Sequence, residues 1–204
     1  MDTVTVKVNR FIRVHIRTRL TFLVVYCGEE CLNRCTYVEC TDNNCSAPET
    51  CSNRTLQNKK WPLIEVIQTE KRGFGLRVNE FVPQGSTIME FIGEYMTKDI
   101  HNEMHRPNTA IYAIDVGNGF VIDAARYGNY ARYINHSCQP NTMAEKWNFD
   151  KTPTIRIVAM RDLQAYEEVS FDYRLSKMAD LHFTCLCESR ACRDSSSKQI
   201  HVQL

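Results

Sequence analysis

One ten-residue stretch, running from Arg132 to Asn141, gathers the polar side chains best suited to chemistry. Its sequence is Arg-Tyr-Ile-Asn-His-Ser-Cys-Gln-Pro-Asn, so an arginine, an Asn-His pair and a cysteine lie beside aromatic and aliphatic residues that favour burial. A buried polar side chain without a hydrogen-bond partner costs roughly 1–3 kcal/mol. These groups therefore either satisfy one another in a structural role or form part of a binding site.

Two further motifs lie downstream of this stretch. The first is Val169-Ser-Phe-Asp-Tyr173, and the second is a Cys-x-Cys-x4-Cys pattern from Cys185 to Cys192. A single polar cluster is adequately explained by structure alone. Three motifs of hydrogen-bonding and metal-binding side chains together favour a functional site over that simpler interpretation.

The ten cysteines are unevenly distributed. Six lie between Cys27 and Cys51, three lie between Cys185 and Cys192, and Cys138 stands alone. We identify no secretory signal, and closely spaced cysteines without one favour zinc thiolate sites over disulfides. The first cluster, about 25 residues long, is also too short to fold unless metal or disulfides hold it together.

The bulk composition is that of an ordinary globular chain, with 43% hydrophobic and 24% charged residues. No apolar run approaches the ~18 residues that span a bilayer, so we expect no membrane partner. The net charge is +1, but residues 1–26 carry +4 and leave −3 on the remainder. A mildly acidic body suits a basic peptide better than naked DNA.

The first residues alternate β-branched and basic side chains, and the run from Leu20 to Tyr26 is typical of a strand. An arginine-rich, acid-poor start is also found in mitochondrial transit peptides. We interpret this segment as an N-terminal extension, and the sequence leaves open whether it is ordered.

Taken together, Asn135-His136-Ser-Cys138, Phe171-Asp-Tyr173 and the cysteine clusters resemble the SET-domain protein lysine methyltransferases. The resemblance covers roughly residues 27–193. It implies a mostly β (α+β) fold, in which small twisted sheets surround a C-terminal pseudoknot and cysteine-rich zinc modules flank them. The expected domains are an N-terminal extension (1–25), an AWS-like zinc module (26–56), the SET catalytic domain (61–174) and a post-SET zinc module (181–197).

Local patterns agree with a mostly β chain. Short apolar or alternating runs separated by Gly, Pro and Asn predict strands at Leu63–Ile67, Thr87–Phe91, Ile111–Val116, Phe120–Ile122, Thr154–Ala159 and Glu168–Phe171. One helix is predicted at Thr97–His105, where Ile100 and Met104 have i, i+4 spacing.

The resemblance assigns catalysis to Tyr173 and Phe171. Methyl transfer from a sulfonium to a lysine amine is a direct displacement, so the protein must align a neutral amine and exclude water. Lysine titrates at about 10.4, and desolvation near a positive sulfonium favours its neutral form. The Tyr173 phenol would orient the amine. Phe171 matches the family's Phe/Tyr switch and leaves room for an amine that already carries methyl groups.

The same resemblance predicts a site for S-adenosylmethionine (AdoMet). Its residues would be Arg72, Gly73, Phe74, Gly75, Tyr112, Arg132, Asn135 and His136. By itself the Gly-x-Gly turn fits a plain hairpin equally well. His136 is expected to act as a structural hydrogen-bonding group and Arg132 as part of an ion pair, with Asp172 as its partner or as another anchor.

The resemblance also assigns the metal ligands. Cys27, Cys31, Cys40, Cys45 and Cys51 match five of the seven AWS ligands, while Cys138, Cys185, Cys187 and Cys192 match the post-SET site. The upstream Cys-x-Cys pair of the AWS module is absent, and Cys35 has no assigned place. A closed structural zinc site needs four ligands, which Cys27, Cys40, Cys45 and Cys51 can supply for one AWS ion. The other AWS ion would keep only Cys27 and Cys31, so we predict about two zinc ions per chain.

The leading hypothesis is an AdoMet-dependent protein lysine N-methyltransferase that modifies histone H3 in nucleosomes, with lysine 36 favoured. It would act as a monomer in the nucleus, at the chromosome, and would reach DNA only through the nucleosome. One alternative is a catalytically weak or inactive zinc-containing chromatin-binding module. Others are a methyltransferase of another histone or non-histone lysine, and a redox-active cysteine protein.

Overall fold

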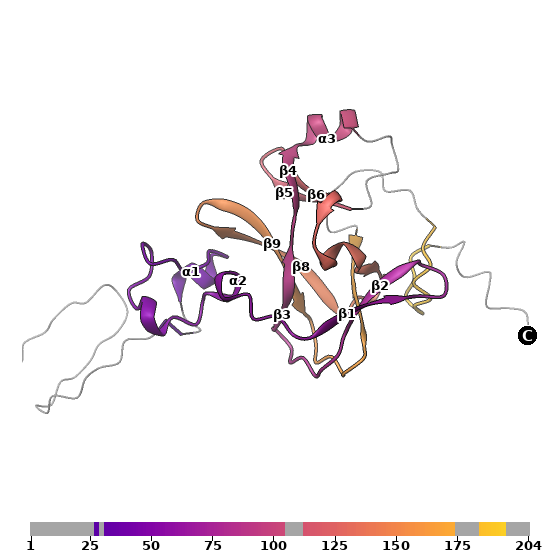
Figure 1. Cartoon of the computed structure of the whole chain (residues 1–204), viewed down its shortest axis with the longest axis horizontal. Coiled ribbons are helices and arrows are strands. Elements are labelled where there is room, and N and C mark those ends of the chain that lie inside the picture. The colour runs from indigo at the N-terminus through magenta and orange to yellow at the C-terminus, as the bar shows by residue number, and fades with distance from the viewer. Residues whose placement is uncertain (1–26, 29–30, 105–111, 174–183, 195–204) are drawn as a thin grey trace, which may run out of the picture.

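Ten short strands in three small sheets are the main regular structure of the described chain (Figure 1). A computed structural model describes residues 27–28, 31–104, 112–173 and 184–194. The mostly β prediction is confirmed. The predicted strand at Leu20–Tyr26 lies outside the described residues.

The first sheet contains β1 (Ile64–Gln68), β2 (Phe74–Val78), β10 (Glu168–Phe171) and β7 (Asn135–His136), in the order β1-β2-β10-β7. The last strand, β10, is antiparallel to β2 and parallel to β7. The C-terminal strand thus returns between two earlier segments, as the pseudoknot prediction requires. This insertion brings the two motif-bearing strands together.

Two three-stranded sheets complete the fold. One sheet contains β3 (Thr87–Phe91), β9 (Thr152–Ala159) and β8 (Thr142–Phe149), in the order β3-β9-β8. The other sheet contains β4 (Gly93–Thr97), β6 (Phe120–Gly128) and β5 (Ala113–Gly117), in the order β4-β6-β5. Where β4 begins, a Cβ on Gly93 would lie 2.5 Å from the backbone of Asp123. The close crossing of β4 and β6 therefore requires glycine there.

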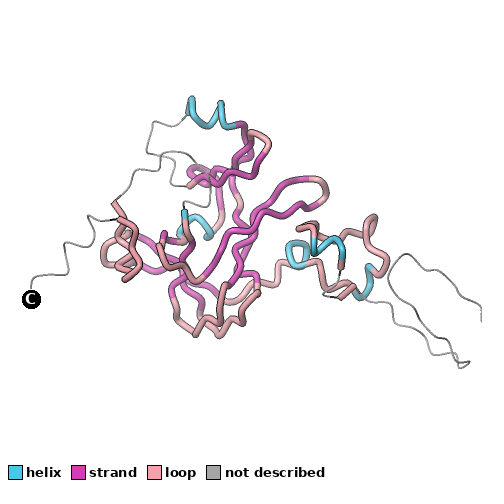
Figure 2. The backbone as a smooth tube through the Cα atoms, turned by 180° about the vertical axis from the view of Figure 1, so that it is seen from behind, coloured by secondary structure: helices cyan, strands magenta, loops and turns pink. Residues whose placement is uncertain are grey.

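The helices are short. They are α1 (Leu32–Cys35), η1 (Pro48–Thr50), α2 (Thr55–Asn58), α3 (Lys98–Met104) and η2 (Tyr130–Tyr133). The predicted helix corresponds to α3, which lies at the periphery (Figures 1 and 2). Its apolar pair, Ile100 and Met104, is about half exposed, whereas His101 is buried. Within the described residues, no helix is long and apolar enough to cross a bilayer.

Strand prediction succeeded where apolar residues dominate. β3 and β10 have the predicted bounds. Four further strands, β2, β4, β7 and β8, were not predicted. The sequences of β2, β4 and β8 mix glycine or charged residues with apolar ones, and β7 consists of two polar residues. The strand β8 forms because all eight of its residues pair with β9, a neighbour with a stronger strand sequence.

A single apolar core joins the three sheets. Its largest fully buried aliphatic side chains are Leu76, Ile88, Ile134, Ile155, Ile157 and Leu163. Ile134 directly precedes the Asn-His pair of β7. Packing of this side chain therefore determines where the polar residues of the central motif emerge.

The cysteine-rich module is attached to the β8–β9 hairpin. Val38 forms a parallel bridge with Asn148, whose carbonyl accepts from Glu39 N at 2.9 Å. The Tyr37 ring meets the Trp147 ring edge-on, with centroids 5.7 Å apart. Figure 1 shows the module, in indigo, beside this hairpin. Backbone pairing and an aromatic contact thus join the two parts.

Candidate active site and zinc centres

The predicted catalytic and cofactor residues meet where β2, β10 and β7 lie side by side. In the parallel β7–β10 pair, Asn135 lies opposite Ser170 and His136 opposite Phe171. Tyr173 follows two residues after the end of β10. The sheet register therefore brings the central motif and the Phe-Asp-Tyr motif together, although they are distant in sequence.

Tyr173 has a fixed position in this arrangement. Its hydroxyl donates to the carbonyl of Ile134 at 2.7 Å, and its ring centroid lies 4.9 Å from that of Phe171 and 5.4 Å from that of His136. Burial raises the pKa of the Tyr173 phenol well above its ordinary value. The phenol is therefore neutral and is not a phenolate base.

His136 connects Tyr173 to a cysteine. The backbone N–H of Tyr173 donates to Nδ1 of His136 at 3.2 Å. A neutral imidazole that accepts at Nδ1 carries its hydrogen on Nε2. That nitrogen lies 3.3 Å from the Sγ of Cys138. Both ring nitrogens are thus engaged with the protein, which agrees with the structural role expected for His136.

The turn from Arg72 to Gly75 uses its two glycines differently. Gly73 has φ of 69°, in the left-handed region that favours glycine. A Cβ on Gly75 would lie 2.8 Å from Oε1 of Glu168 and 3.1 Å from Nδ2 of Asn135. A side chain at position 75 would therefore displace the polar groups of Glu168 and Asn135.

Glu168 is a site residue that sequence reasoning missed. Its carboxylate pairs with the Arg72 guanidinium at 2.8 Å and accepts from the Asn135 amide at 2.9 Å. The same amide donates to the carbonyl of Phe74 at 3.1 Å. The only signal in the sequence was a carboxylate at the start of an apolar strand, which is ordinarily a solvent-exposed charge.

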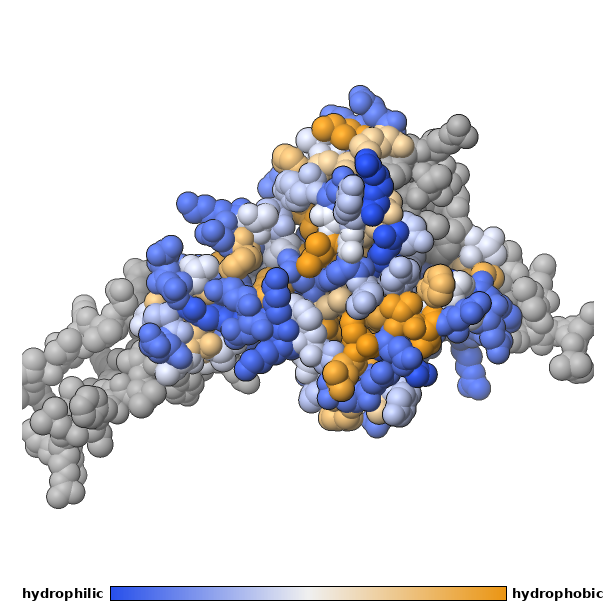
Figure 3. Space-filling view, in the orientation of Figure 1, coloured by the Kyte–Doolittle hydropathy of each residue, from blue (hydrophilic) through white to orange (hydrophobic). Residues whose placement is uncertain are grey.

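Aromatic residues surround the remaining predicted cofactor residue, Arg132. Its guanidinium lies 5.1 Å from the ring centroid of Tyr112 and 5.8 Å from that of Tyr133, within cation–π range. Tyr133 also contacts Phe74 edge-on at 5.8 Å. Phe74 is 59% exposed, and apolar side chains gather over the β1 and β2 region (Figure 3). The arrangement offers an accessible aromatic surface next to cationic groups.

In the structure Asp172 is a structural anchor and not the ion-pair partner of Arg132. Its carboxylate binds the guanidinium of Arg193, and its Oδ1 lies 3.7 Å from His136. Arg132 instead donates to the backbone carbonyl of Ala125 at 2.8 Å. Asp172 therefore anchors the C-terminal segment, whereas Arg132 anchors the start of the central motif to β6.

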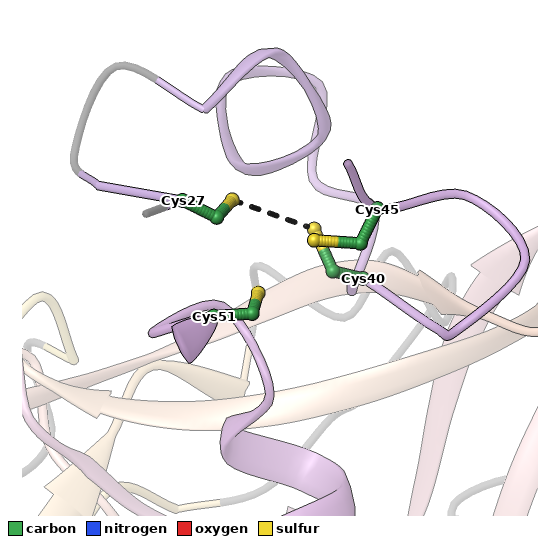
Figure 4. A group of neighbouring side chains, drawn as sticks. All are labelled: Cys27, Cys40, Cys45 and Cys51. Carbon is green, nitrogen blue, oxygen red and sulfur yellow. Dashed lines mark hydrogen bonds between the residues drawn. The ribbon is translucent and has the colours of Figure 1, made fainter. Parts of the chain in front are cut away.

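The first thiol cluster comprises Cys27, Cys40, Cys45 and Cys51, whose sulfur atoms all lie within 4.8 Å of one another. They point toward a common centre (Figure 4). The Cys27 and Cys40 sulfurs are 3.8 Å apart. Two thiolates on one tetrahedral zinc, with Zn–S bonds of about 2.3 Å, lie about 3.8 Å apart, so the donor set fits zinc.

Two amides favour the thiolate form of Cys40. Burial by itself would raise the pKa of this thiol, but Asn33 and Asn53 each donate to its sulfur at 3.3 Å and lower the pKa to about 7. Cys31 lies outside the four-thiol group, although its sulfur is 3.6 Å from that of Cys40. Cys35 is exposed. Four of the five predicted AWS ligands therefore share one centre, and the fifth, Cys31, lies next to that group.

The second thiol cluster comprises Cys138, Cys185, Cys187 and Cys192, again within 4.8 Å of one another. Cys138 and Cys185 sulfurs are 3.7 Å apart, which also fits tetrahedral zinc. Burial raises the pKa of the Cys185 thiol. All ten cysteines are described and none forms a disulfide, so the disulfide interpretation is not supported.

Comparison with known proteins identifies two domain families. The SET domain model matches residues 73–174, and the AWS domain model matches residues 25–59. The chain is 35% identical over 173 residues to histone-lysine N-methyltransferase ASHH2 of Arabidopsis thaliana, covering 82% of this chain and 10% of that protein. Over 174 residues it is 33% identical to histone-lysine N-methyltransferase SETD2 of Mus musculus, covering 83% of this chain and 7% of the relative.

A third relative is a histone-lysine N-methyltransferase, H3 lysine-36 specific, of Debaryomyces hansenii. It is 35% identical over 173 residues, which cover 81% of this chain and 24% of the relative. The chain therefore spans less than a quarter of the length of these three relatives. Because the SET model covers half of the chain, and because the site geometry brings its motifs together, the chain belongs to the SET-domain family and carries an AWS domain before its SET domain.

Proposed function

We propose that this chain is an AdoMet-dependent protein lysine N-methyltransferase that acts on histone H3, with lysine 36 favoured. The observation that carries the proposal is the neutral phenol of Tyr173 on the carbonyl of Ile134, whose neighbour Asn135 lies against the Arg72–Gly75 turn. The printed names of the relatives support histone lysine as the substrate class, and the Debaryomyces hansenii name supports lysine 36.

The side chains around the turn fit the amino-acid end of AdoMet. Arg72 provides guanidinium donors suited to a carboxylate, and the Asn135 amide can offer its oxygen to an ammonium group. The exposed ring of Phe74 and the ring of Tyr133 provide apolar surface for the rest of the molecule. When bound, AdoMet supplies the methyl group on a positively charged sulfur.

The residues of the chain would act on the lysine by orientation. Since Tyr173 donates its hydrogen to Ile134, the lone pairs of its oxygen can face the amine and the polarised methyl group. Phe171 is buried against Tyr173 and adds an apolar wall without a hydroxyl. The amine loses its proton to water before transfer, so no carboxylate base is needed.

Zinc would serve structure in both thiol clusters. One ion would be held by Cys27, Cys40, Cys45 and Cys51, and a second by Cys138, Cys185, Cys187 and Cys192. Four thiolates close a tetrahedral site and leave no open position for catalysis. We propose about two zinc ions per chain. A measured value near three would mean that Cys31 and further ligands complete another site.

We further propose that the protein acts as a monomer on nucleosomes in the nucleus, at the chromosome, and contacts DNA only there. We divide it into an extension (1–25), an AWS module (26–56), a SET domain (61–174) and a post-SET module (181–197). The joint presence of the Gly-x-Gly turn, the Asn-His pair and Tyr173 supports an enzyme over an inactive chromatin-binding module.

The test uses purified, zinc-loaded chain with labelled AdoMet and nucleosomes, followed by mass spectrometry of histone H3. We expect label on lysine 36, with no label when the tail lysine is replaced by arginine. Label on another lysine would correct the substrate assignment alone. Tight nucleosome binding with no transfer to any histone would favour the inactive module.

A further inference from the structure

Glu168 is a carboxylate that methyl transfer itself does not require, yet it lies among the residues proposed to hold AdoMet. It begins β10, the strand that separates β2 from β7. From this central strand it reaches Arg72, which precedes β2, and Asn135 on β7. One side chain thus connects three segments of the site.

The first effect of Glu168 concerns the orientation of the Asn135 amide. An amide nitrogen carries two hydrogens. In Asn135 they are directed to the carbonyl of Phe74 at 3.1 Å and to Oε1 of Glu168 at 2.9 Å. Both donors are therefore used by the protein. The amide oxygen, to which no described residue donates a hydrogen bond, is left as an acceptor for a cationic ligand.

The second effect concerns Arg72. Its Nη2 pairs with Oε2 of Glu168 at 2.8 Å, and both side chains are 26% exposed. A guanidinium has five N–H donors, so this pair holds Arg72 in place and leaves other donors for a ligand carboxylate. Each oxygen of Glu168 therefore accepts from one partner, Oε1 from Asn135 and Oε2 from Arg72.

The sequence around the turn accommodates this contact. A Cβ on Gly75 would lie 2.8 Å from the same Oε1 and 3.1 Å from the same Asn135 nitrogen. A side chain at position 75 would have to displace the Glu168 carboxylate, so glycine there keeps the contact in place. The contact is thus part of the closely packed interior of the turn rather than a chance surface pair.

We propose that Glu168 is a positioning residue, which orients Arg72 and Asn135 toward the carboxylate and ammonium groups of AdoMet. This inference rests on the proposed function, because it assumes AdoMet as the ligand. Glu168 would act through its two partners and would not touch the reacting methyl group.

The test compares Glu168→Gln with Glu65→Gln in the zinc-loaded full chain. Glu65 is a matched control because it also pairs with an arginine, Arg77, at 2.7 Å in the same sheet. AdoMet and S-adenosylhomocysteine affinities would be measured by calorimetry, and thermal unfolding would be followed in parallel. Kinetics would separate the KM for AdoMet from the KM for nucleosomes.

For Glu168→Gln we expect the Kd for AdoMet to rise about tenfold, the effect of weakening one charge-assisted hydrogen bond. The KM for AdoMet should rise in parallel, while the KM for nucleosomes stays unchanged. Glu65→Gln should leave the AdoMet Kd within about twofold. An unchanged Kd in Glu168→Gln, or an equal change in both variants, would overturn the assignment.

Glu168→Asp provides a second variant if Glu168→Gln fails to fold. It keeps the charge but is one methylene too short to reach both partners, so AdoMet binding should still weaken. Retained affinity in a folded Glu168→Asp variant would contradict the two-partner geometry. Wild-type protein that binds no AdoMet would instead contradict the proposed function, and the role of Glu168 with it.

Discussion

The two four-cysteine clusters contain the same number of thiols but gather them differently. The first takes all four from residues 27–51, and backbone pairing at Val38 attaches it to the β8–β9 hairpin. The second combines Cys138, from the central motif, with three cysteines beyond the SET match. Among the described residues, only the second cluster contains a thiol, that of Cys138, that also contacts His136, a residue of the proposed active site.

This difference indicates different consequences of metal binding. A local cluster stabilises the short segment that contains it. A cluster that joins distant segments also holds those segments in register with each other. Here Arg193, next to Cys192, binds Asp172, and Ser189 contacts Gln139. The second metal should therefore matter for catalysis and the first mainly for stability.

The largest expected effect comes from Tyr173→Phe, which removes the hydroxyl of the proposed catalytic residue. We expect turnover to fall about a thousandfold, as when one oriented polar group is deleted from an active site. AdoMet affinity should stay within several-fold, because the phenol acts on the amine and methyl group. Single-turnover transfer and calorimetry provide the measurements. Tyr166→Phe, at a residue 67% exposed, is the control.

The proposed difference between the two thiol clusters is tested most directly by comparing Cys185→Ser, in the second cluster, with Cys45→Ser, in the first. Elemental analysis should show about one zinc ion in each variant instead of about two. Turnover should fall about a hundredfold in Cys185→Ser but about threefold or less in Cys45→Ser, whose main change is a lower unfolding temperature. Equal losses of turnover would show that the clusters are functionally equivalent.

His136 offers a finer test of the link between zinc and Tyr173. An asparagine oxygen can replace Nδ1 as acceptor for the Tyr173 N–H, whereas a glutamine nitrogen can replace Nε2 toward Cys138. His136→Gln should therefore lower kcat about tenfold with zinc retained, and His136→Asn should weaken zinc retention about tenfold. If both variants change kcat alone, or both change zinc retention alone, His136 does not connect Tyr173 to the second thiol cluster.

The smallest expected effect concerns the product. Wild-type protein should proceed beyond monomethyl-lysine, because Phe171 has no hydroxyl to crowd a methylated amine. Phe171 is 5% exposed and packs against Tyr173, so Phe171→Tyr adds a buried hydroxyl there. Monomethyl product should accumulate in this variant, while the rate of the first methyl transfer changes about threefold or less. Mass spectrometry of the product distribution checks this. Phe81→Tyr, at a half-exposed ring, should leave the distribution unchanged.

Much of the fold could be predicted because apolar strands carry a local signal. Thr87–Phe91 and Glu168–Phe171 are rich in aliphatic and aromatic residues, and both were located correctly. β7 could not be predicted, since two polar residues form a strand only when β10 is placed beside them. The outward orientation of Ile100 and Met104 likewise depends on which face of α3 the rest of the chain covers.

The cysteine spacing and the Asn-His and Phe-Asp-Tyr motifs determined, without any structure, the family, the chemistry to expect and the segments that hold metal ligands. Tertiary structure alone decided that Asp172 pairs with Arg193 and that Glu168 joins Arg72 to Asn135. Motifs are local, so the order of residue types contains them. A contact between β10 and the distant β7 exists only after the C-terminal strand has inserted, and no local preference encodes that step.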